Sequence, residues 1–344
     1  MEFVTQAFNE AVVRIFILGV VAFLLAMLLT PIYTFVAYRY KFWKRQRTET
    51  TTGEKIKVFL KLHAEKFKRN IPTMAGMVFV LAIVIVTFFM NLDRRETWLP
   101  LAALAGGAIV GLIDDIINIR GGGKGVAGLR SQIKFVMIAL IGAVLGWYFF
   151  EKLGVSTVHV PFVGDWELGW FIVPIFAFIV VSMGNAVNIS DGLDGLAGGL
   201  AAVAYTAFGV IALLQGTPML AGFCFTVVGA LLSYLWFNIY PARFFMGDVG
   251  SFALGTSLGV IAMLTDSLFI LPIIALLFVV EAGSSLIQII SKRLFKRKVF
   301  ISAPIHHHLE AIGWPETKVT MRFWVIAAVM AFVGVMLAID GGNI

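Results

Sequence analysis

Long apolar runs constrain the fold of this 344-residue chain more than any other feature. A bilayer core about 30 Å thick is crossed by ~20 residues of helix. Because the runs are continuously apolar and do not alternate, they favour helices over the strands of a membrane barrel. A composition of 60% hydrophobic and 14% charged residues is also atypical of a water-soluble chain. We therefore expect an all-α integral membrane protein with ten spans, at residues 12–37, 73–91, 98–113, 133–150, 169–187, 193–214, 219–237, 250–264, 268–290 and 321–339.

Lysine and arginine are distributed unevenly between the two sets of loops. Residues 38–72 carry eleven of the 27, and the loops after the third, seventh and ninth spans carry twelve more. Since positively charged loops remain in the cytoplasm, these loops are predicted to be cytoplasmic and both termini to lie outside. Most of these cations need only orient the chain and contact lipid headgroups. The net charge of +7 therefore does not indicate a nucleic-acid partner.

A short segment between the fourth and fifth spans differs from the apolar runs. Residues 156–170, "STVHVPFVGDWELGW", alternate in the manner of strands and contain a Gly-Asp turn. This pattern predicts a small extracytoplasmic β-hairpin.

Polar residues gather in five segments, all on the predicted cytoplasmic side. We call them the five polar segments: "KRNIPTMAG" (68–76), "LIDDIINI" (112–119), "NAVNISDGLDGLA" (185–197), "NIYPARFFMGDVGS" (238–251) and "APIHHHLE" (303–310). Their shared side predicts one composite site on a single polytopic domain, 1–344. The catalytic loops are expected at residues 38–72, 114–132, 185–197, 238–250 and 291–320.

Five aspartates stand out within these segments: Asp114, Asp115, Asp191, Asp194 and Asp248. Adjacent positions on a helix differ by about 100°, so only one of the first pair should point directly into a site. The i, i+3 spacing of the second pair predicts a shared face at the start of the sixth span. Helix capping is an alternative role for Asp191 and Asp248.

The acids as a group indicate a divalent cation. Carboxylates at a membrane edge are costly unless they are paired, solvated or bound to metal. Oxygen ligands favour Mg²⁺, which usually binds one or two carboxylates together with substrate phosphates. Nearby cations, Lys68, Lys124 and Arg130, point to a diphosphate substrate.

Histidine and aromatic residues add further candidates. Three consecutive residues cannot easily reach one metal, so we expect one or two of His306, His307 and His308 to contact phosphate or sugar and the third to hold the loop. Glu281 lies inside the ninth span, where it is either functional or paired with a neighbouring serine or Gln288. A phenylalanine ring at 244 or 245 is suited to stacking on a nucleobase.

These motifs resemble those of the bacterial phospho-N-acetylmuramoyl-pentapeptide transferases, within the polyprenyl-phosphate N-acetylhexosamine-1-phosphate transferase superfamily. The resemblance extends from "PTMAG" to "RFW" at 322–324 and includes "NAVNISDGLDGLA", "FFMGDVGS" and "PIHHHLE". It implies a homodimeric enzyme of the bacterial inner membrane whose site faces the cytoplasm and depends on Mg²⁺. The implied reaction moves phospho-MurNAc-pentapeptide from UDP-MurNAc-pentapeptide to undecaprenyl phosphate in the lipid bilayer, giving lipid I and UMP.

The resemblance also implies roles for single residues. Asp114, Asp115 and Asp248 match the family's essential acids, with Asp248 as the metal ligand, and His306 matches a residue of the catalytic region. We expect Asp114 to activate the lipid phosphate, although a covalent route with Asp114 as nucleophile stays open. The residues implied or expected to contact substrate are Lys68, Thr73, Lys124, Arg130, Asn188, Asp191, Asp194, Asn238, Phe245, His307 and His308.

The chain departs from the family pattern in two places, and two rival functions remain. Asn70, Ile71 and Ala75 replace the family's usual Gly, Thr and Gly, and "IINIRGGGKG" lacks its usual aromatic residue and lysine. One rival is transfer of GlcNAc-1-phosphate from UDP-GlcNAc, which pocket size and the histidine block would distinguish. The other is an ion-coupled transporter, which should show charges near the membrane midplane and an internal repeat. We find only Glu281 at depth and no repeat.

Overall fold

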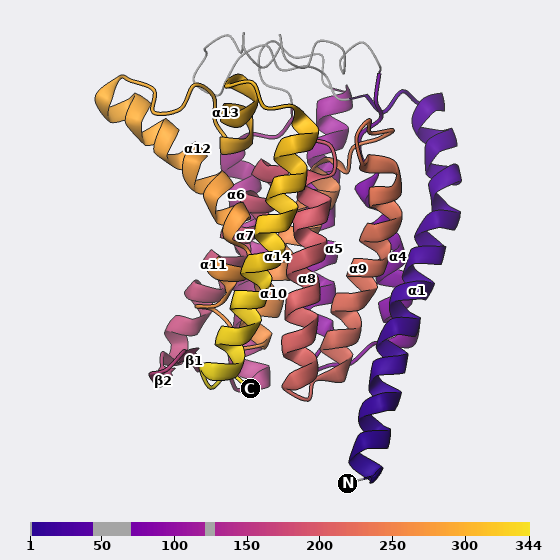
Figure 1. Ribbon diagram of the computed structural model, residues 1–344, viewed down its shortest axis with the longest axis vertical. Helices are drawn as coiled ribbons and strands as arrows, with labels where there is room; N and C mark the ends of the chain where they lie inside the picture. Colours follow the sequence, from indigo (N-terminus) through magenta and orange to yellow (C-terminus); the bar gives the residue numbers. More distant parts are fainter. Residues whose placement is uncertain (1, 44–69, 121–127) are drawn as a thin grey trace.

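The computed structural model describes residues 2–43, 70–120 and 128–344. Within these residues, eight helices are long and apolar enough to cross a membrane, as expected of a multi-pass membrane protein. They run side by side along the long axis, and α1 begins at the same end of the bundle where α14 ends (Figure 1). The eight are α1 (Glu2–Arg39), α5 (Trp98–Arg120), α6 (Ser131–Leu153), α7 (Ile172–Ser190), α8 (Leu196–Leu214), α9 (Pro218–Asn238), α10 (Gly247–Leu264) and α14 (Glu316–Asp340).

The expected ten spans correspond to these eight helices, one shorter helix and one divided segment. α4 (Gly76–Met90) has 15 residues. The prediction of a single span over 268–290 is wrong, because the chain breaks at Ala275 into α11 (Leu271–Ile274) and α12 (Leu276–Phe295). α12 leans away from the other helices toward its C-terminal end, where α13 (Ile305–Ala311) follows (Figure 1).

α10 lies at the centre of the bundle, packed mainly against α5 and α7. Its most apolar 18-residue stretch is 94% buried, whereas the corresponding stretch of α1 is 22% buried. Glycine permits the close approach of α5: a Cβ atom at Gly111 would overlap the backbone carbonyl of Asp248. Small residues at such crossings are how membrane helices bring their backbones together. The crossing therefore fixes the start of α10 against α5.

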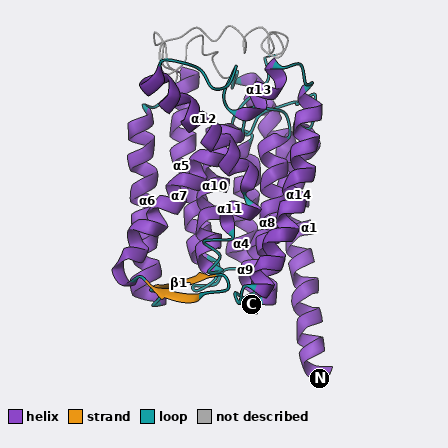
Figure 2. Ribbon diagram, turned by 60° about the vertical axis from the view of Figure 1, so that its left-hand side comes forward, coloured by secondary structure: helices purple, strands orange, loops and turns teal. Residues whose placement is uncertain are grey.

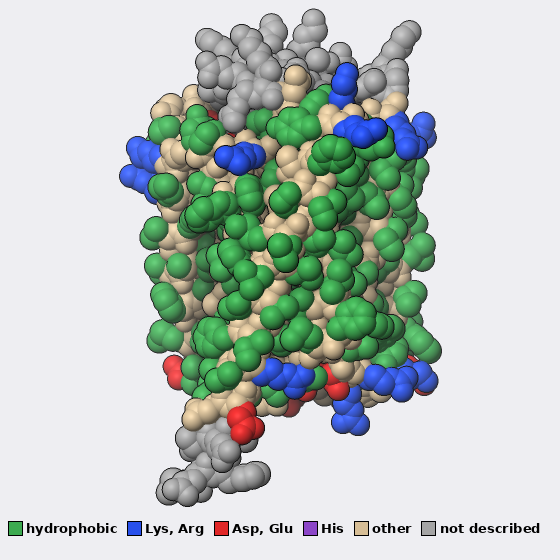
Figure 3. Space-filling model, turned by 90° about the vertical axis from the view of Figure 1, so that its right-hand side faces the viewer, with side chains coloured by type: hydrophobic (Ala, Val, Ile, Leu, Met, Phe, Trp, Pro, Cys, Tyr) green, Lys and Arg blue, Asp and Glu red, His purple; other side chains and the backbone are tan. Residues whose placement is uncertain are grey.

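The outer surface of the bundle suits a lipid environment. Figure 3 shows a broad apolar band, with lysine and arginine gathered above and below it. Exposed side chains along α1, such as Phe16, Leu24 and Phe35, contribute to that apolar surface. Such a band between charged rims is what a protein surrounded by acyl chains requires.

A two-stranded antiparallel hairpin connects α6 to α7. β1 (Thr157–Val160) pairs with β2 (Gly164–Glu167), Val158 lies opposite Trp166, and the short 3-10 helix η1 (Gly169–Phe171) leads into α7. The hairpin lies at the end of the bundle where α14 ends (Figure 2).

Contacts from the hairpin fasten the end of α14. His159 bonds through Nε2 to the Gly341 carbonyl at 2.8 Å and through Nδ1 to Asp165 Oδ1 at 2.6 Å. Its backbone N–H donates to Asp266 Oδ1 at 2.9 Å, in the turn between α10 and α11. Since both ring nitrogens face oxygen acceptors, this geometry favours the doubly protonated imidazolium.

Candidate active site

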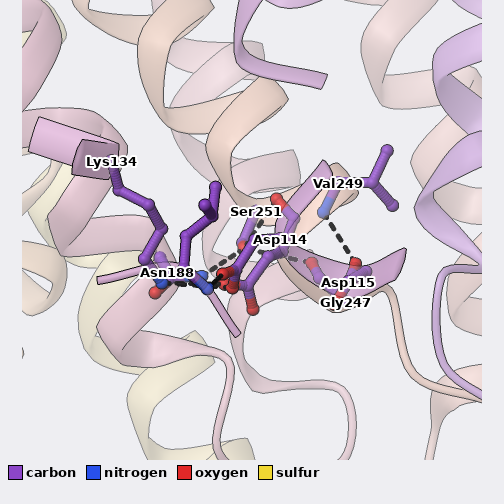
Figure 4. A network of polar contacts seen from close by, with 9 residues as sticks. Asp114, Asp115, Lys134, Asn188, Gly247, Val249 and Ser251 are labelled. Atoms are coloured by element: carbon purple, nitrogen blue, oxygen red, sulfur yellow. Dashed lines mark hydrogen bonds and ion pairs between the residues drawn. The ribbon is translucent and has the colours of Figure 1, made fainter. Parts of the chain in front are cut away.

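Two buried carboxylates share one ammonium group where α5, α6 and α10 meet. Lys134 Nζ lies 3.1 Å from Asp114 Oδ2 and 3.3 Å from Asp248 Oδ2 (Figure 4). Asp114 and Asp248 expose 0% and 6% of their surface. The Leu129 backbone N–H also donates to Asp114. Charge-assisted bonds of this kind offset the cost of burying the acids.

Asp115 turns away from this pair toward the start of α10. Its Oδ2 accepts a hydrogen bond from the Val249 N–H at 3.1 Å (Figure 4). The first N–H groups of a helix have no partner within the helix, and a carboxylate there also complements the helix dipole. Asp115 therefore caps α10 from another helix. Asp248 lies in the first turn of α10 while Met246 occupies the N-cap position, so the capping alternative for Asp248 is wrong.

The first polar segment contacts the fourth through its backbone. Phe245 N–H donates to the Pro72 carbonyl at 2.8 Å, and Ala75 N–H donates to the Phe245 carbonyl at 3.0 Å. Gly247 has φ of +73°, and a Cβ there would lie 2.5 Å from Asp115 Oδ2 and 2.9 Å from Thr73 Oγ1. Only glycine fits this position comfortably. Thr73 is thereby held beside Asp115.

Asn188 joins the site from the end of α7. Its Nδ2 donates to Ser251 Oγ at 2.9 Å, one turn into α10. Ser251 Oγ donates in turn to the Gly247 carbonyl at 3.1 Å. The third polar segment is thus connected to the glycine turn that carries Asp248.

Asp191 and Asp194 do not share a helix face, so that prediction is wrong. α7 ends at Ser190 and α8 begins at Leu196, which places both acids in the turn between them. Gly195, at φ +75°, is the N-cap of α8, and Asp191 follows the end of α7, so capping of α8 by Asp191 is also wrong. Asp194 Oδ2 instead accepts from Ala242 N–H at 3.0 Å.

Asn238 fixes the same turn from α9. Its Oδ1 accepts from Gly195 N–H at 2.9 Å, and its Nδ2 donates to the Phe244 carbonyl at 2.9 Å. Asp194 and Asn238 therefore join the third polar segment to the fourth. Both residues are buried, at 2% and 3% exposure, and their side chains form hydrogen bonds with backbone groups.

The fifth polar segment reaches the third through a histidine. His306 is fully buried, and its Nδ1 lies 2.7 Å from Glu281 Oε2. A Cβ atom at Gly192 would overlap Nε2, the other nitrogen of the same ring. The hydrogen-bond partner of the Glu281 carboxylate is therefore His306, and not the neighbouring serine or Gln288 that was one of the two alternatives for this acid.

The other two histidines hold local structure around α13. His307 Nδ1 lies 2.8 Å from Glu310 Oε2, and His308 Nδ1 accepts from Ile301 N–H at 3.2 Å. Gln288 on α12 binds the backbone of Val299 and Phe300 that leads to α13. The three histidines thus have different hydrogen-bond partners, although the rings of His306 and His307 meet edge to face with centroids 4.1 Å apart.

The two candidate phenylalanines differ in their surroundings. Phe244 is buried at 4% exposure, with its ring 5.5 Å from that of Tyr33. Phe245 is only partly buried. Of the two, Phe245 retains the surface that stacking on a base would need.

The cations of the site differ from the expected set. Lys68 and Lys124 lie outside the described residues, and Arg130 is exposed at the N-cap of α6. Lys134, one helical turn later, holds the acids. In the sequence, Lys134 was one of the basic residues after the third predicted span, and these residues were expected only to orient the chain. Its position inside the predicted span 133–150 was the missed signal, because a lysine in a span is a functional candidate.

The donor set suits a hard cation completed by a ligand. In the part of the chain that the structure describes, no group of three or more His, Cys, Asp or Glu side chains is arranged to hold a metal. Mg²⁺ commonly uses one or two protein carboxylates and takes its remaining oxygens from phosphates and water. Asp114 and Asp248 already share a cationic group, so these two residues could hold a divalent cation.

Comparisons with known proteins identify the family. Residues 97–266 match the model "Glycosyl transferase family 4". A phospho-N-acetylmuramoyl-pentapeptide-transferase of Chloroflexus aurantiacus is 38% identical over 96% of this chain and 90% of its own length. Proteins of the same name from Geobacillus kaustophilus and Clostridium perfringens are 38% and 36% identical, covering 93% and 91% of this chain and 96% and 94% of their own lengths. The chain therefore belongs to the phospho-N-acetylmuramoyl-pentapeptide transferase family, a family of membrane enzymes.

Proposed function

We propose that this protein transfers phospho-MurNAc-pentapeptide from UDP-MurNAc-pentapeptide to undecaprenyl phosphate, releasing UMP and forming lipid I. The observation that carries the proposal is that the five polar segments contact one another in a chain, and that two of their acids, Asp114 and Asp248, share Lys134. The family name favours the muramoyl substrate over UDP-GlcNAc. A site at the end of apolar helices suits a reaction between a water-soluble nucleotide and a lipid.

In this proposal Asp248, the expected metal ligand, would hold Mg²⁺ together with Asp114, because both carboxylates already face one cationic group. The bound ion would neutralise the diphosphate and stabilise the departing UMP. Phe245 offers a ring to the uracil, and Thr73 and Asn188 border the same site. Arg130, Lys68 and Lys124 remain proposed contacts for phosphate, and Asp191, His307 and His308 remain proposed contacts for substrate.

Direct attack by the lipid phosphate fits the surroundings of Asp114 better than a covalent intermediate. The carboxylate accepts a bond from Leu129 N–H, which stabilises its charge and reduces its nucleophilicity. A phosphate monoester is largely ionised near pH 7, its second pKa being about 6, so it needs little help from a base. Asp114 is accordingly proposed to orient the acceptor phosphate through the cation that it would help to hold, and not to attack as a nucleophile.

Charge supports a cytoplasmic site in the bacterial inner membrane. Arg39 and Arg120 lie in the last turns of α1 and α5, and most lysine and arginine residues of the sequence fall in the segments that follow α1, α5, α9 and α12. Loops rich in lysine and arginine stay in the cytoplasm. The same rule leaves the hairpin and both termini outside. The family resemblance supports a homodimer.

UMP release from the purified protein in detergent tests the proposal. The assay supplies undecaprenyl phosphate with UDP-MurNAc-pentapeptide or UDP-GlcNAc, each with Mg²⁺ or EDTA. We expect Mg²⁺-dependent release from the muramoyl substrate, and a loss of at least ~100-fold in Asp248→Asn, as expected for removal of a metal-binding transition-state contact.

Two outcomes would count against it. Release from UDP-GlcNAc alone would assign the protein to the neighbouring branch of the superfamily. Absence of release from either substrate, in protein with an intact unfolding transition, would reject the transferase activity.

A further inference from the structure

Lys134 is placed to serve both acids at once. It occupies the first turn of α6, while Asp114 and Asp248 belong to α5 and α10. Its side chain is 14% exposed, and its ammonium lies 5.7 Å from the centre of the Phe252 ring. The ammonium therefore occupies a partly enclosed position between two carboxylates and an aromatic face.

Gly128 and Leu129, which lie just before α6, position Lys134 next to Asp114. Leu129 donates its N–H to the same Asp114 whose other oxygen faces Lys134. A Cβ at Gly128, φ +97°, would lie 2.6 Å from Asp114 Oδ1. The turn is thus closely fitted to the acid, and it delivers the lysine to a defined place.

Electrostatics favour a cation at this position. Two like charges buried close together destabilise each other, and each also loses hydration. An ammonium group shared between them relieves both costs. A divalent ion would do the same with twice the charge, and it would need the same carboxylate oxygens.

We propose that Lys134 is a stand-in for the divalent cation: its ammonium neutralises Asp114 and Asp248 until Mg²⁺ binds, and Mg²⁺ must displace it. The inference rests on the Mg²⁺ site of the proposed function. Lysine suits this exchange because its charge is compact and its four-carbon stem is flexible. The metal affinity of the resting protein is then lowered by the competing lysine.

Binding of Mn²⁺, followed by the loss of its free EPR signal, tests the inference without substrate. The proteins to compare in detergent at pH 8 are the wild type, Lys134→Met and Lys134→Arg. Lys152→Met is the matched control, because it removes the same charge from the same helix about 27 Å away, at 1.5 Å per residue. Asp248→Asn tests whether the bound Mn²⁺ occupies the site that contains Asp248.

Removal of the competing charge should tighten Mn²⁺ binding by about tenfold or more in Lys134→Met. Lys134→Arg should bind like the wild type or more weakly, and Lys152→Met should not change. Equal or weaker binding in Lys134→Met would overturn the inference, since it would mean that Lys134 supports the metal or is indifferent to it. If the wild type binds no Mn²⁺, the proposed metal site itself is wrong. That result differs from equal or weaker binding in Lys134→Met, which rejects only the competition by Lys134.

A measurement on the wild-type protein covers the case in which Lys134→Met does not fold. Amine acetylation quantified by mass spectrometry compares Lys134 with Lys152 in EDTA and in Mg²⁺. Displacement predicts that acetylation of Lys134 rises severalfold in Mg²⁺ while that of Lys152 stays constant. Unchanged acetylation at both positions would contradict displacement.

Discussion

At the residue scale, Glu281 and His306 form a buried pair that joins two elements of the chain. Both side chains are fully buried, and they come from α12 and α13, which the 296–304 loop separates. The ring also lies against Gly192 in the third polar segment. A buried charge left without its partner is strongly destabilising. We therefore expect Glu281 to position His306.

Glu281→Gln should separate positioning from folding. Glutamine keeps an acceptor oxygen but loses the charge, so we expect a stability loss of about 1–3 kcal/mol and a lower kcat with little change in KM. Glu310→Gln is the matched control, because it weakens the contact to His307 within the same short helix. Thermal unfolding and UMP release measure the two effects. An equal fall in kcat for both variants would contradict the assignment.

Several site residues were predictable because their chemistry is conspicuous in an apolar chain. Asp114, Asp248 and His306 stand out in this way, and the structure places each of them in buried polar contacts. The partner choices were not predictable. Whether Asp115 faces Lys134, as Asp114 does, or caps α10 depends on a tertiary crossing, which no local pattern encodes. The same holds for the pairing of Glu281 with His306.

At the scale of elements, glycine sets the distance between α5 and α10. A methyl group at Gly111 would overlap the Asp248 backbone carbonyl, whereas one at Gly283 on α12 would meet nothing within 4 Å. The two positions thus form a natural comparison between a packed and an open helical glycine.

Gly111→Ala should destabilise the protein by about 1–3 kcal/mol, the usual cost of overpacking, and should reduce UMP release by displacing Asp248. Gly283→Ala should be neutral or should stabilise by up to ~1 kcal/mol, because alanine is the better helix former. Thermal unfolding in detergent compares the variants. A similar response at the two positions would show that the crossing does not limit the packing of α10.

The division of the ninth predicted span illustrates what hydropathy cannot provide. Residues 268–290 are apolar enough to suggest one helix, yet the chain breaks at Ala275. The useful signal was the polar stripe formed by Glu281, Ser284 and Gln288, at spacings of three and four. The stripe holds the chain that returns after α12, including Ile305 N–H on Ser284 Oγ at 2.9 Å. The stripe indicates a helix face that contacts another part of the protein, although it does not predict the break at Ala275.

At the scale of the whole molecule, His159 links the end away from the site into one network. Its bond to the Gly341 carbonyl, followed by its contact with Asp165, raises its pKa above the ordinary 6.5. Burial raises the pKa of Asp266 as well. Because the folded protein binds the His159 proton more tightly than the unfolded chain, the stabilisation is fully present below about pH 6.5. It is lost as pH rises through the higher folded pKa.

Melting temperature measured from pH 6 to pH 9 should therefore fall through the titration of His159. His159→Gln should be less stable than the wild type at pH 6, and the two proteins should approach each other at high pH. Asp266 is present in both, so the difference between the curves isolates the histidine. A difference that grows with pH would contradict this assignment.

The burial of α10 has a consequence for how the protein is made. Its mean hydropathy of 1.4 is the lowest of the eight long helices, and α1 has the highest at 2.8. A helix of that composition gains little from contact with lipid and gains most from contact with other helices. Both principal neighbours, α5 and α7, precede it in the chain. The helix that carries Asp248 therefore enters the membrane during synthesis into a space that earlier helices have already prepared.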